Sequence, residues 1–155
     1  MTETMLERSI VLRFLGEPAP QGSKTVSRWG GLREVSKKIE PWRASIQYAC
    51  AEQYKGEPIT DPVTMNVQFI LPRSKNHFST AKGKTHLLLP SAPVHHVKTP
   101  DADKLLRGLL DPLTVRCGGN VLMDDSQIVD ITCNKRYQKD GTESIGALCA
   151  IRILR

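Results

Sequence analysis

The hydrophobic and polar residues of this chain alternate most clearly between Val63 and Leu71. Apolar side chains there are separated by Thr64, Asn66 and Gln68, so an extended segment would bury one face and expose a polar one. Three further apolar stretches rich in β-branched residues also predict strands. They are residues 10–15, 128–137 and 145–154.

Two stretches instead repeat their apolar residues every three or four positions, the spacing of a helix with one buried face. The first covers residues 36–54 and includes Trp42; because Pro41 fits the first turn of a helix, the helix should start near residue 40. The second presents a leucine face of Leu105, Leu106, Leu109, Leu110 and Leu113. Together these elements predict a single α/β domain of the α+β-like kind over residues 1–155, with a mixed sheet of about four or five strands and two main helices.

Charge and composition narrow the classes of partner. The 155 residues carry a formal net charge of +6 and a sequence pI of about 9.3, which favours a polyanion such as nucleic acid or an anionic membrane. No apolar run is long enough to span a bilayer, and residues 1–7 contain no signal-peptide core, so we expect a cytoplasmic protein. The four cysteines form no CxxC pair, which argues against a zinc ribbon or a disulfide framework.

Two basic stretches lack a clear periodicity. Residues 21–33 contain a Gly-Ser-Lys sequence without the full P-loop spacing, and a flexible arm on a DNA backbone and an ordinary solvated loop explain them equally well. Residues 73–98 form a long irregular segment of a kind that is usually functional or disordered. We interpret it as a mobile substrate-binding loop, with a solvated insertion as the alternative. Residues 1–8 are expected to be a flexible N-terminus.

Two pairs of aspartates stand out in this basic chain. Asp101 and Asp103 flank the expected start of the leucine-faced helix, and Asp124 and Asp125 precede the strand at 128–137. If Asp101 ends an extended segment and Asp103 opens the helix, both carboxylates can converge on one point. Each pair alone has a plain explanation, a helix cap for the first and a polar turn for the second.

The joint occurrence of the two pairs is more informative than either pair. Three or four carboxylates around one pocket repel one another unless a cation neutralises them, and Mg²⁺ is the natural cation because it prefers oxygen ligands. Such a metal can activate water and stabilise a leaving oxygen in phosphodiester hydrolysis. Arg107, one helical turn beyond Asp103, could stabilise charge on the phosphate. These features predict a metal-dependent nuclease.

The segments PDADKLLR at 100–107 and MDDSQIVD at 123–130 resemble the core of the RusA family of Holliday junction resolvases, many of which are encoded by phages and prophages. That core reads approximately D-x-D-N, a helix, then D-D-x-Q-V-x-D. Phe14 and the PAPQG segment at 18–22 are similar to the first strand and following loop of the family. The likeness is close over residues 99–137.

The resemblance implies a homodimeric, Mg²⁺-dependent endonuclease, with Mn²⁺ as a substitute metal, that makes paired symmetric nicks across a four-way DNA junction. By matching position, Asp101, Asp103 and Asp125 are the expected catalytic metal ligands, and Asp124 is an expected supporting ligand. Arg107 stands where the family often has a functional lysine. That departure keeps the positive charge and changes its geometry.

Basic residues around these segments are expected to contact DNA. They are Lys24, Arg28, Arg73, Lys75, Lys82, Lys84, Lys98, Lys104 and Lys135. Three alternatives remain at this point. The first is a nuclease with the same active site that prefers flaps or forks. The second is a non-catalytic DNA-binding module in which the aspartates only cap a helix and shape a turn. The third is a protein that binds an anionic membrane or a ribosome, although no basic amphipathic helix supports the membrane version.

Overall fold

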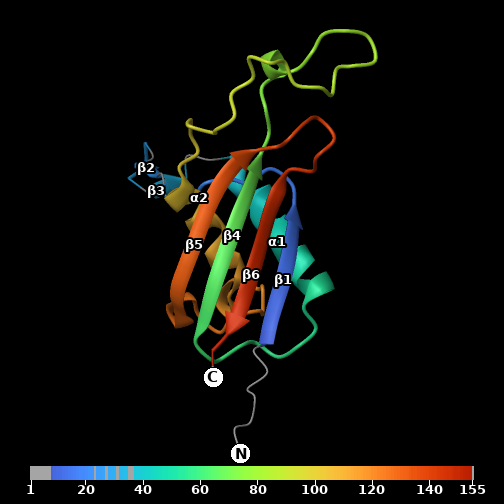
Figure 1. The fold of residues 1–155 in the computed structure, drawn as a ribbon. Coiled ribbons are helices and arrows are strands. Elements are labelled where there is room, and N and C mark those ends of the chain that lie inside the picture. The colour runs from blue at the N-terminus through green and yellow to red at the C-terminus, as the bar shows by residue number, and fades with distance from the viewer. Residues whose placement is uncertain (1–7, 23, 27, 31, 35–36, 155) are drawn as a thin grey trace, which may run out of the picture.

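A four-stranded mixed sheet forms the centre of the molecule (Figure 1). The computed structural model describes residues 8–22, 24–26, 28–30, 32–34 and 37–154. The strands of the sheet, in spatial order, are β1 (Arg8–Leu15), β6 (Gly146–Ile153), β4 (Val63–Leu71) and β5 (Ile128–Tyr137). The β4–β5 pair is parallel and the other two pairs are antiparallel. The mixed sheet confirms the predicted fold class.

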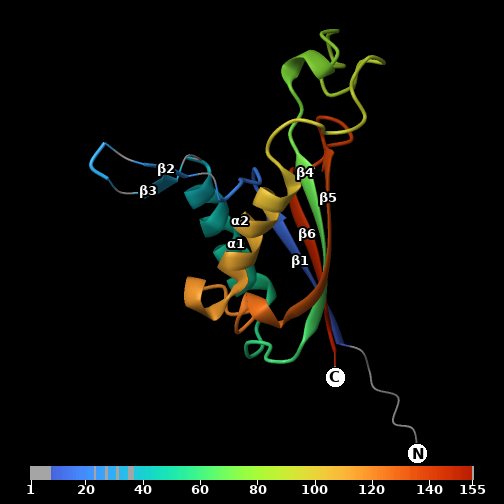
Figure 2. The same ribbon diagram turned by 90° about the vertical axis from the view of Figure 1, so that its left-hand side faces the viewer.

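Two α-helices cover one face of this sheet (Figure 2). They are α1 (Ile39–Gln53) and α2 (Ala102–Leu113). Three short 3₁₀ helices occur in the connections: η1 (Lys75–His77), η2 (Val115–Cys117) and η3 (Asp125–Gln127). No described helix lies over the opposite face of the sheet (Figure 2). None of the helices in the described ranges is long and apolar enough to cross a membrane.

The buried core lies between the sheet and the two helices. Alternate residues of β4 and β1 point into it, including Val67, Phe69, Leu12 and Phe14, whose side chains are fully buried. Leucines of α2 and the indole of Trp42 on α1 meet them from the other side. The predicted helical leucine face and the core position of Trp42 are therefore confirmed, because each apolar stripe is buried against its neighbour.

The element boundaries differ from the sequence expectation at a few points. Helix α1 begins at Ile39, so Pro41 lies in its first turn as predicted. The first strand begins at Arg8, within the stretch expected to be a flexible N-terminus; the rest of that stretch falls outside the described residues. All four cysteines are free, and Cys50 and Cys149 are buried.

A two-stranded hairpin occupies the stretch that we expected to be a loop. Strand β2 (Lys24–Val26) pairs antiparallel with β3 (Leu32–Glu34). Each strand has three residues, too few for alternation to be visible in the sequence. In Figure 2 the hairpin stands away from the helices on the side opposite the sheet.

The segment at 73–98 is largely irregular, as predicted, apart from η1 and an isolated bridge between Phe78 and Leu88. It forms the extension beyond the end of the sheet in Figure 1. Its two ends are joined by Arg73, whose guanidinium donates to the backbone carbonyls of Pro93 and Gln138 at 2.7 and 2.8 Å.

Candidate active site

The N-terminus of α2 carries the first aspartate pair. Asp101 is the N-cap residue, with an extended backbone at φ −73° and ψ 145°, and Asp103 lies in the first helical turn. The main chain of Asp101 opens the helix, because its carbonyl accepts from the N–H of Leu105 at 3.0 Å. Its side chain, however, makes no capping hydrogen bond within the described chain. The exposed carboxylate is therefore not used as a helix cap.

The surroundings of this pair are basic. The Lys104 ammonium lies 3.7 Å from the Asp101 carboxylate, an exposed ion pair that contributes little to stability. The carboxylate of Asp103 makes no hydrogen bond or ion pair with any described residue. Arg107 is exposed one turn further along α2. Both carboxylates thus face solvent at a helix end where the dipole favours negative charge.

A loop from the beginning of the chain packs along this part of α2. The N–H of Gln21 donates to the carbonyl of Lys104 at 2.9 Å, and its side-chain amide donates to Asp111 at 2.9 Å. Gly22 has φ +111°, and a Cβ built there would lie 2.7 Å from a guanidinium nitrogen of Arg107. Glycine at this position therefore leaves room for the arginine.

A lysine from β5 holds the segment that leads into Asp101. The Lys135 ammonium donates to the carbonyl of Lys98 at 2.7 Å and to the carbonyl of Pro100 at 2.9 Å. Two of its three protons are thereby used within the protein. We expected Lys135 to contact DNA, whereas its position ties the central sheet to the residue before Asp101.

The second aspartate pair is built differently. Asp124 is the N-cap of η3 and forms a capping box, in which its N–H donates to the Gln127 side chain at 3.0 Å. The hydroxyl of Ser126 donates to the Asp124 carboxylate at 2.6 Å, and this hydrogen bond lowers the pKa of Asp124. The amide of Gln127 also donates to the carbonyls of Ile59 and Asp61, both at 2.8 Å. Asp124 therefore serves the local structure, as the polar-turn interpretation expected.

The first pair lies at the start of α2, and the second pair lies just before the start of β5. In Figure 2 the starts of these two elements lie toward opposite ends of the sheet. Helix α2 has 12 residues, which corresponds to a length of about 18 Å. Lys135 binds the carbonyl next to Asp101 and pairs with a residue near the end of β4. Ile128 follows η3 and pairs with the first residue of β4. That separation along β5 is about 23 Å. Among the described residues no group of three or more His, Cys, Asp or Glu could hold a metal ion, so a single protomer does not form the expected four-carboxylate pocket.

The expected DNA contacts are spread over three places. Lys75, Lys82, Lys84 and Lys98 are exposed along the 73–98 segment, and Arg28 is exposed in the hairpin turn. The side chain of Lys24 lies outside the described residues. Arg73, Lys104 and Lys135 are partly buried, and Arg73 and Lys135 already bond to backbone carbonyls.

An aromatic cluster fixes the base of the long segment, and the sequence did not indicate it. The guanidinium of Arg73 lies 4.6 Å from the centre of the Tyr137 ring, and the imidazoles of His77 and His96 lie 5.3 and 4.7 Å from it. Burial lowers the pKa of both histidines, and nearby cations lower it further: Arg73 and Lys98 for His77, and chiefly Lys135 for His96. The cluster joins the candidate DNA-binding segment to the sheet beside Lys135.

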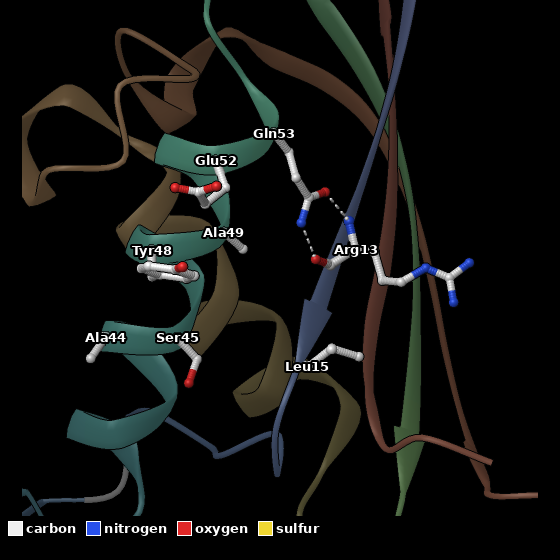
Figure 3. A pocket seen from close by; sticks show the side chains of 8 residues that line it. All are labelled: Arg13, Leu15, Ala44, Ser45, Tyr48, Ala49, Glu52 and Gln53. Atoms are coloured by element: carbon white, nitrogen blue, oxygen red, sulfur yellow. Dashed lines mark hydrogen bonds between the residues drawn. The ribbon is translucent and has the colours of Figure 1, made fainter. Parts of the chain in front are cut away.

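A pocket of about 510 Å³ lies elsewhere, between α1 and the edge strand β1 (Figure 3). The amide of Gln53 bonds both backbone groups of Arg13, at 2.8 and 2.6 Å. The lining includes Tyr48 and Leu15 and has a single acidic residue, Glu52. Because neither aspartate pair contributes to it, we place the candidate chemistry at the start of α2 and not in this pocket.

Comparison with known proteins identifies the family of the chain. No curated protein matches the chain. The family model described as Endodeoxyribonuclease RusA matches residues 16–145, a range that includes the PAPQG loop, α2 and both aspartate pairs. The chain therefore belongs to the RusA endodeoxyribonuclease family.

Proposed function

We propose that this protein is a Mg²⁺-dependent, structure-specific endonuclease that resolves four-way DNA junctions by paired symmetric nicks in recombination and repair. The observation that carries the proposal is the carboxylate of Asp101, which lies at a helix start without capping it, beside a carboxylate of Asp103 that has no partner among the described residues. Membership of an endodeoxyribonuclease family supports DNA as the substrate.

The donor set at the start of α2 suits magnesium. Asp101 and Asp103 offer two exposed carboxylates, and Mg²⁺ in proteins is usually held by one or two carboxylates together with water and substrate phosphate. We propose that these two residues hold the ion and that Mn²⁺ can replace it. The bound cation would supply activation of water and stabilisation of the leaving oxygen in phosphodiester hydrolysis.

Basic residues near the start of α2 and in the 73–98 segment would bind the phosphates of the DNA. The guanidinium of Arg107 is exposed on the same helix and can donate two parallel hydrogen bonds to phosphate oxygens. The exposed lysines of the 73–98 segment add attraction for the DNA backbone, so binding should weaken as salt concentration rises. The same proposal places the protein in the cytoplasm, where bacterial or infecting phage DNA is found.

A homodimer would reconcile the two aspartate pairs with one reaction centre. Within one protomer the carbonyl next to Asp101 is bound by Lys135 near the end of β5, whereas Asp125 precedes the start of β5, a separation of about 23 Å along the strand. If all three carboxylates act on one phosphate, Asp125 must come from a second copy. A two-fold dimer would also present two equivalent sites to the two symmetric strands of a junction. We therefore propose an active site completed by two protomers.

The direct test is cleavage of a synthetic mobile four-way junction, compared with a flap, a fork and a linear duplex. Each substrate is incubated with Mg²⁺ or with EDTA, using the unmodified protein and Asp101→Asn. Paired nicks in the junction that require Mg²⁺ and disappear in the variant, with binding retained, would support the proposal. Binding that is equal in both proteins and never followed by cleavage would replace it with a non-catalytic DNA-binding module.

A different branched substrate is the second candidate. The exposed basic segment at 73–98 could guide single-stranded arms as well as duplex arms, because its expected phosphate contacts do not depend on base pairing. Faster nicking of the flap or the fork than of the junction would favour this candidate. It would leave the roles of Asp101 and Asp103 unchanged.

A further inference from the structure

An exposed tryptophan lies at the tip of the β2–β3 hairpin. The side chain of Trp29 is 92% exposed, more than any other large apolar side chain in the described part of the chain. Trp42, by contrast, is 1% exposed in the core. A large aromatic group is normally buried because its transfer from water is favourable. A fully exposed indole therefore points to a partner that covers it.

The backbone presents this indole away from the body of the protein. Trp29 and its neighbours Arg28 and Gly30 form the turn beyond the two short strands. Gly30 has φ +84°, and nothing lies within 4 Å of the position where its Cβ would be. Figure 2 shows the hairpin standing clear of the helices. A flat ligand can thus approach Trp29 without displacing other described residues.

The hairpin rises from the candidate active site. Its root is held on α2 by the bond from the Gln21 N–H to Lys104 and by the close approach of Gly22 to Arg107. Trp29 lies seven residues beyond Gly22, a reach of at most about 25 Å for an extended chain. Successive bases along one DNA strand are about 3.4 Å apart. Trp29 can therefore touch bases within about seven positions of a phosphate bound at Arg107.

We propose that Trp29 stacks on an unpaired base at the branch point of the DNA substrate, with Arg28 beside it on the phosphate backbone. This inference rests on the proposed function, whose substrate it specifies further. Every base has a flat π face that an indole can cover, and such stacking does not depend on sequence. In a continuous duplex the faces of the bases are hidden by their neighbours, whereas a branch point exposes them. The exposed guanidinium of Arg28 suits the adjacent phosphate.

The two tryptophans allow a direct measurement by fluorescence. A four-way junction, a linear duplex of the same sequence and a single strand are titrated in EDTA, which prevents cleavage, with emission excited in tryptophan alone. The junction and the single strand should quench the emission of Trp29 and protect it from acrylamide, and the duplex should do neither. Trp29→Phe removes this response, while emission from buried Trp42 reports that the fold is intact.

Binding measurements with three variants separate stacking from charge. Trp29→Ala should weaken junction binding by about tenfold or more, whereas duplex binding stays nearly unchanged. Trp29→Phe should recover most of the loss, because it restores an aromatic face. Arg28→Ala is the matched control, and it should weaken binding to junction and duplex alike and reduce the salt dependence.

Three results would overturn the inference. The first is that junction binding does not change Trp29 emission and that substitution of Trp29 does not change junction affinity. The second is that the linear duplex quenches the emission as strongly as the junction does. The third is that the emission changes with protein concentration in the absence of DNA. The last would indicate contact between copies of the chain. The proposed nuclease function fails separately, if the unmodified protein cuts no branched DNA in Mg²⁺ even though Trp29 responds to the junction.

Discussion

The N-cap residues of the two aspartate pairs, Asp101 and Asp124, occupy similar local positions and use their carboxylates differently. Asp101 and Asp124 are both N-cap residues with extended backbones, and each is followed closely by a second aspartate. Asp124 caps η3 and accepts from Ser126, whereas the carboxylate of Asp101 caps nothing in the described chain. An aspartate at a helix start is therefore evidence for chemistry only when its side chain is not needed to cap that helix.

The difference follows from what surrounds each pair. The η3 turn is a three-residue helix that depends on side chains, because Gln127 links it to the carbonyls of Ile59 and Asp61. Helix α2 is held instead by its buried leucines and by the loop at Gln21. Its first turn can therefore leave two carboxylates exposed without losing the helix.

The largest expected effect is on cleavage at the first pair. Asp103→Asn removes a charge that no described residue uses, so junction cleavage should fall about 100-fold or more while thermal stability and junction binding are kept. Glu52→Gln, an exposed acid on α1, is the control and should cleave normally. Full activity of Asp103→Asn would remove the functional contrast between the pairs.

Mixing two inactive variants tests whether the pairs act together across a dimer. When the Asp101→Asn and Asp125→Asn proteins are mixed in equal amounts, half of the randomly formed dimers contain one chain of each variant. Each of these mixed dimers would contain one intact composite site. Co-refolded mixtures should therefore regain about a quarter of the sites and produce single nicks, not paired ones. A mixture as inactive as its two parents would show that each protomer works alone.

Lys135→Met tests how the first pair is positioned. The substitution removes the ammonium that binds the carbonyls of Lys98 and Pro100. Because Asp101 then shifts, kcat should fall about tenfold or more, while KM stays nearly constant. The exposed Lys139, changed to methionine, is the control. A raised KM with a smaller salt dependence would instead assign Lys135 to DNA phosphate.

Gln127→Ala should act mainly on stability, because its side chain fixes the η3 turn. The substitution removes the side-chain donor to the carbonyl of Asp61 and to that of Ile59, which still accepts from the N–H of Met123, and it removes one bond of the capping box. The expected cost is roughly 1–3 kcal/mol in unfolding free energy. Urea denaturation measures it. Gln68→Ala, which loses one exposed bond to Asn134, is the comparison and should cost clearly less.

The smallest effect concerns the pH dependence of the second pair. The hydrogen bond from Ser126 lowers the pKa of Asp124 in the folded protein, so its contribution is complete above the ordinary value of 3.8 and is lost as pH falls through the lowered pKa. Asp124→Asn should lower the melting temperature at neutral pH, and the difference should shrink in acid. A difference independent of pH would indicate a cap that works without charge.

The long apolar patterns predicted the fold well. Alternation in β4 and the leucine spacing in α2 each report one face that must be buried, and the structure buries those faces. The β2–β3 hairpin was missed because strands of three residues carry no measurable period. The cluster around Tyr137 was missed because Arg73, His77 and His96 reach it from distant positions along the chain.

The sequence alone determined which long elements form, which faces they bury, and which residues are candidates for metal and DNA. These properties depend on local spacing and composition, which the order of residues records directly. Only the tertiary structure decided that Asp101 is not used as a cap while Asp124 is, that Lys135 holds the approach to Asp101, and that the two aspartate pairs lie near opposite ends of β5. The last two facts depend on contacts between segments distant in the sequence, which are set by how the elements pack across the sheet. The first depends on which side chains each helix start needs once its surroundings are packed.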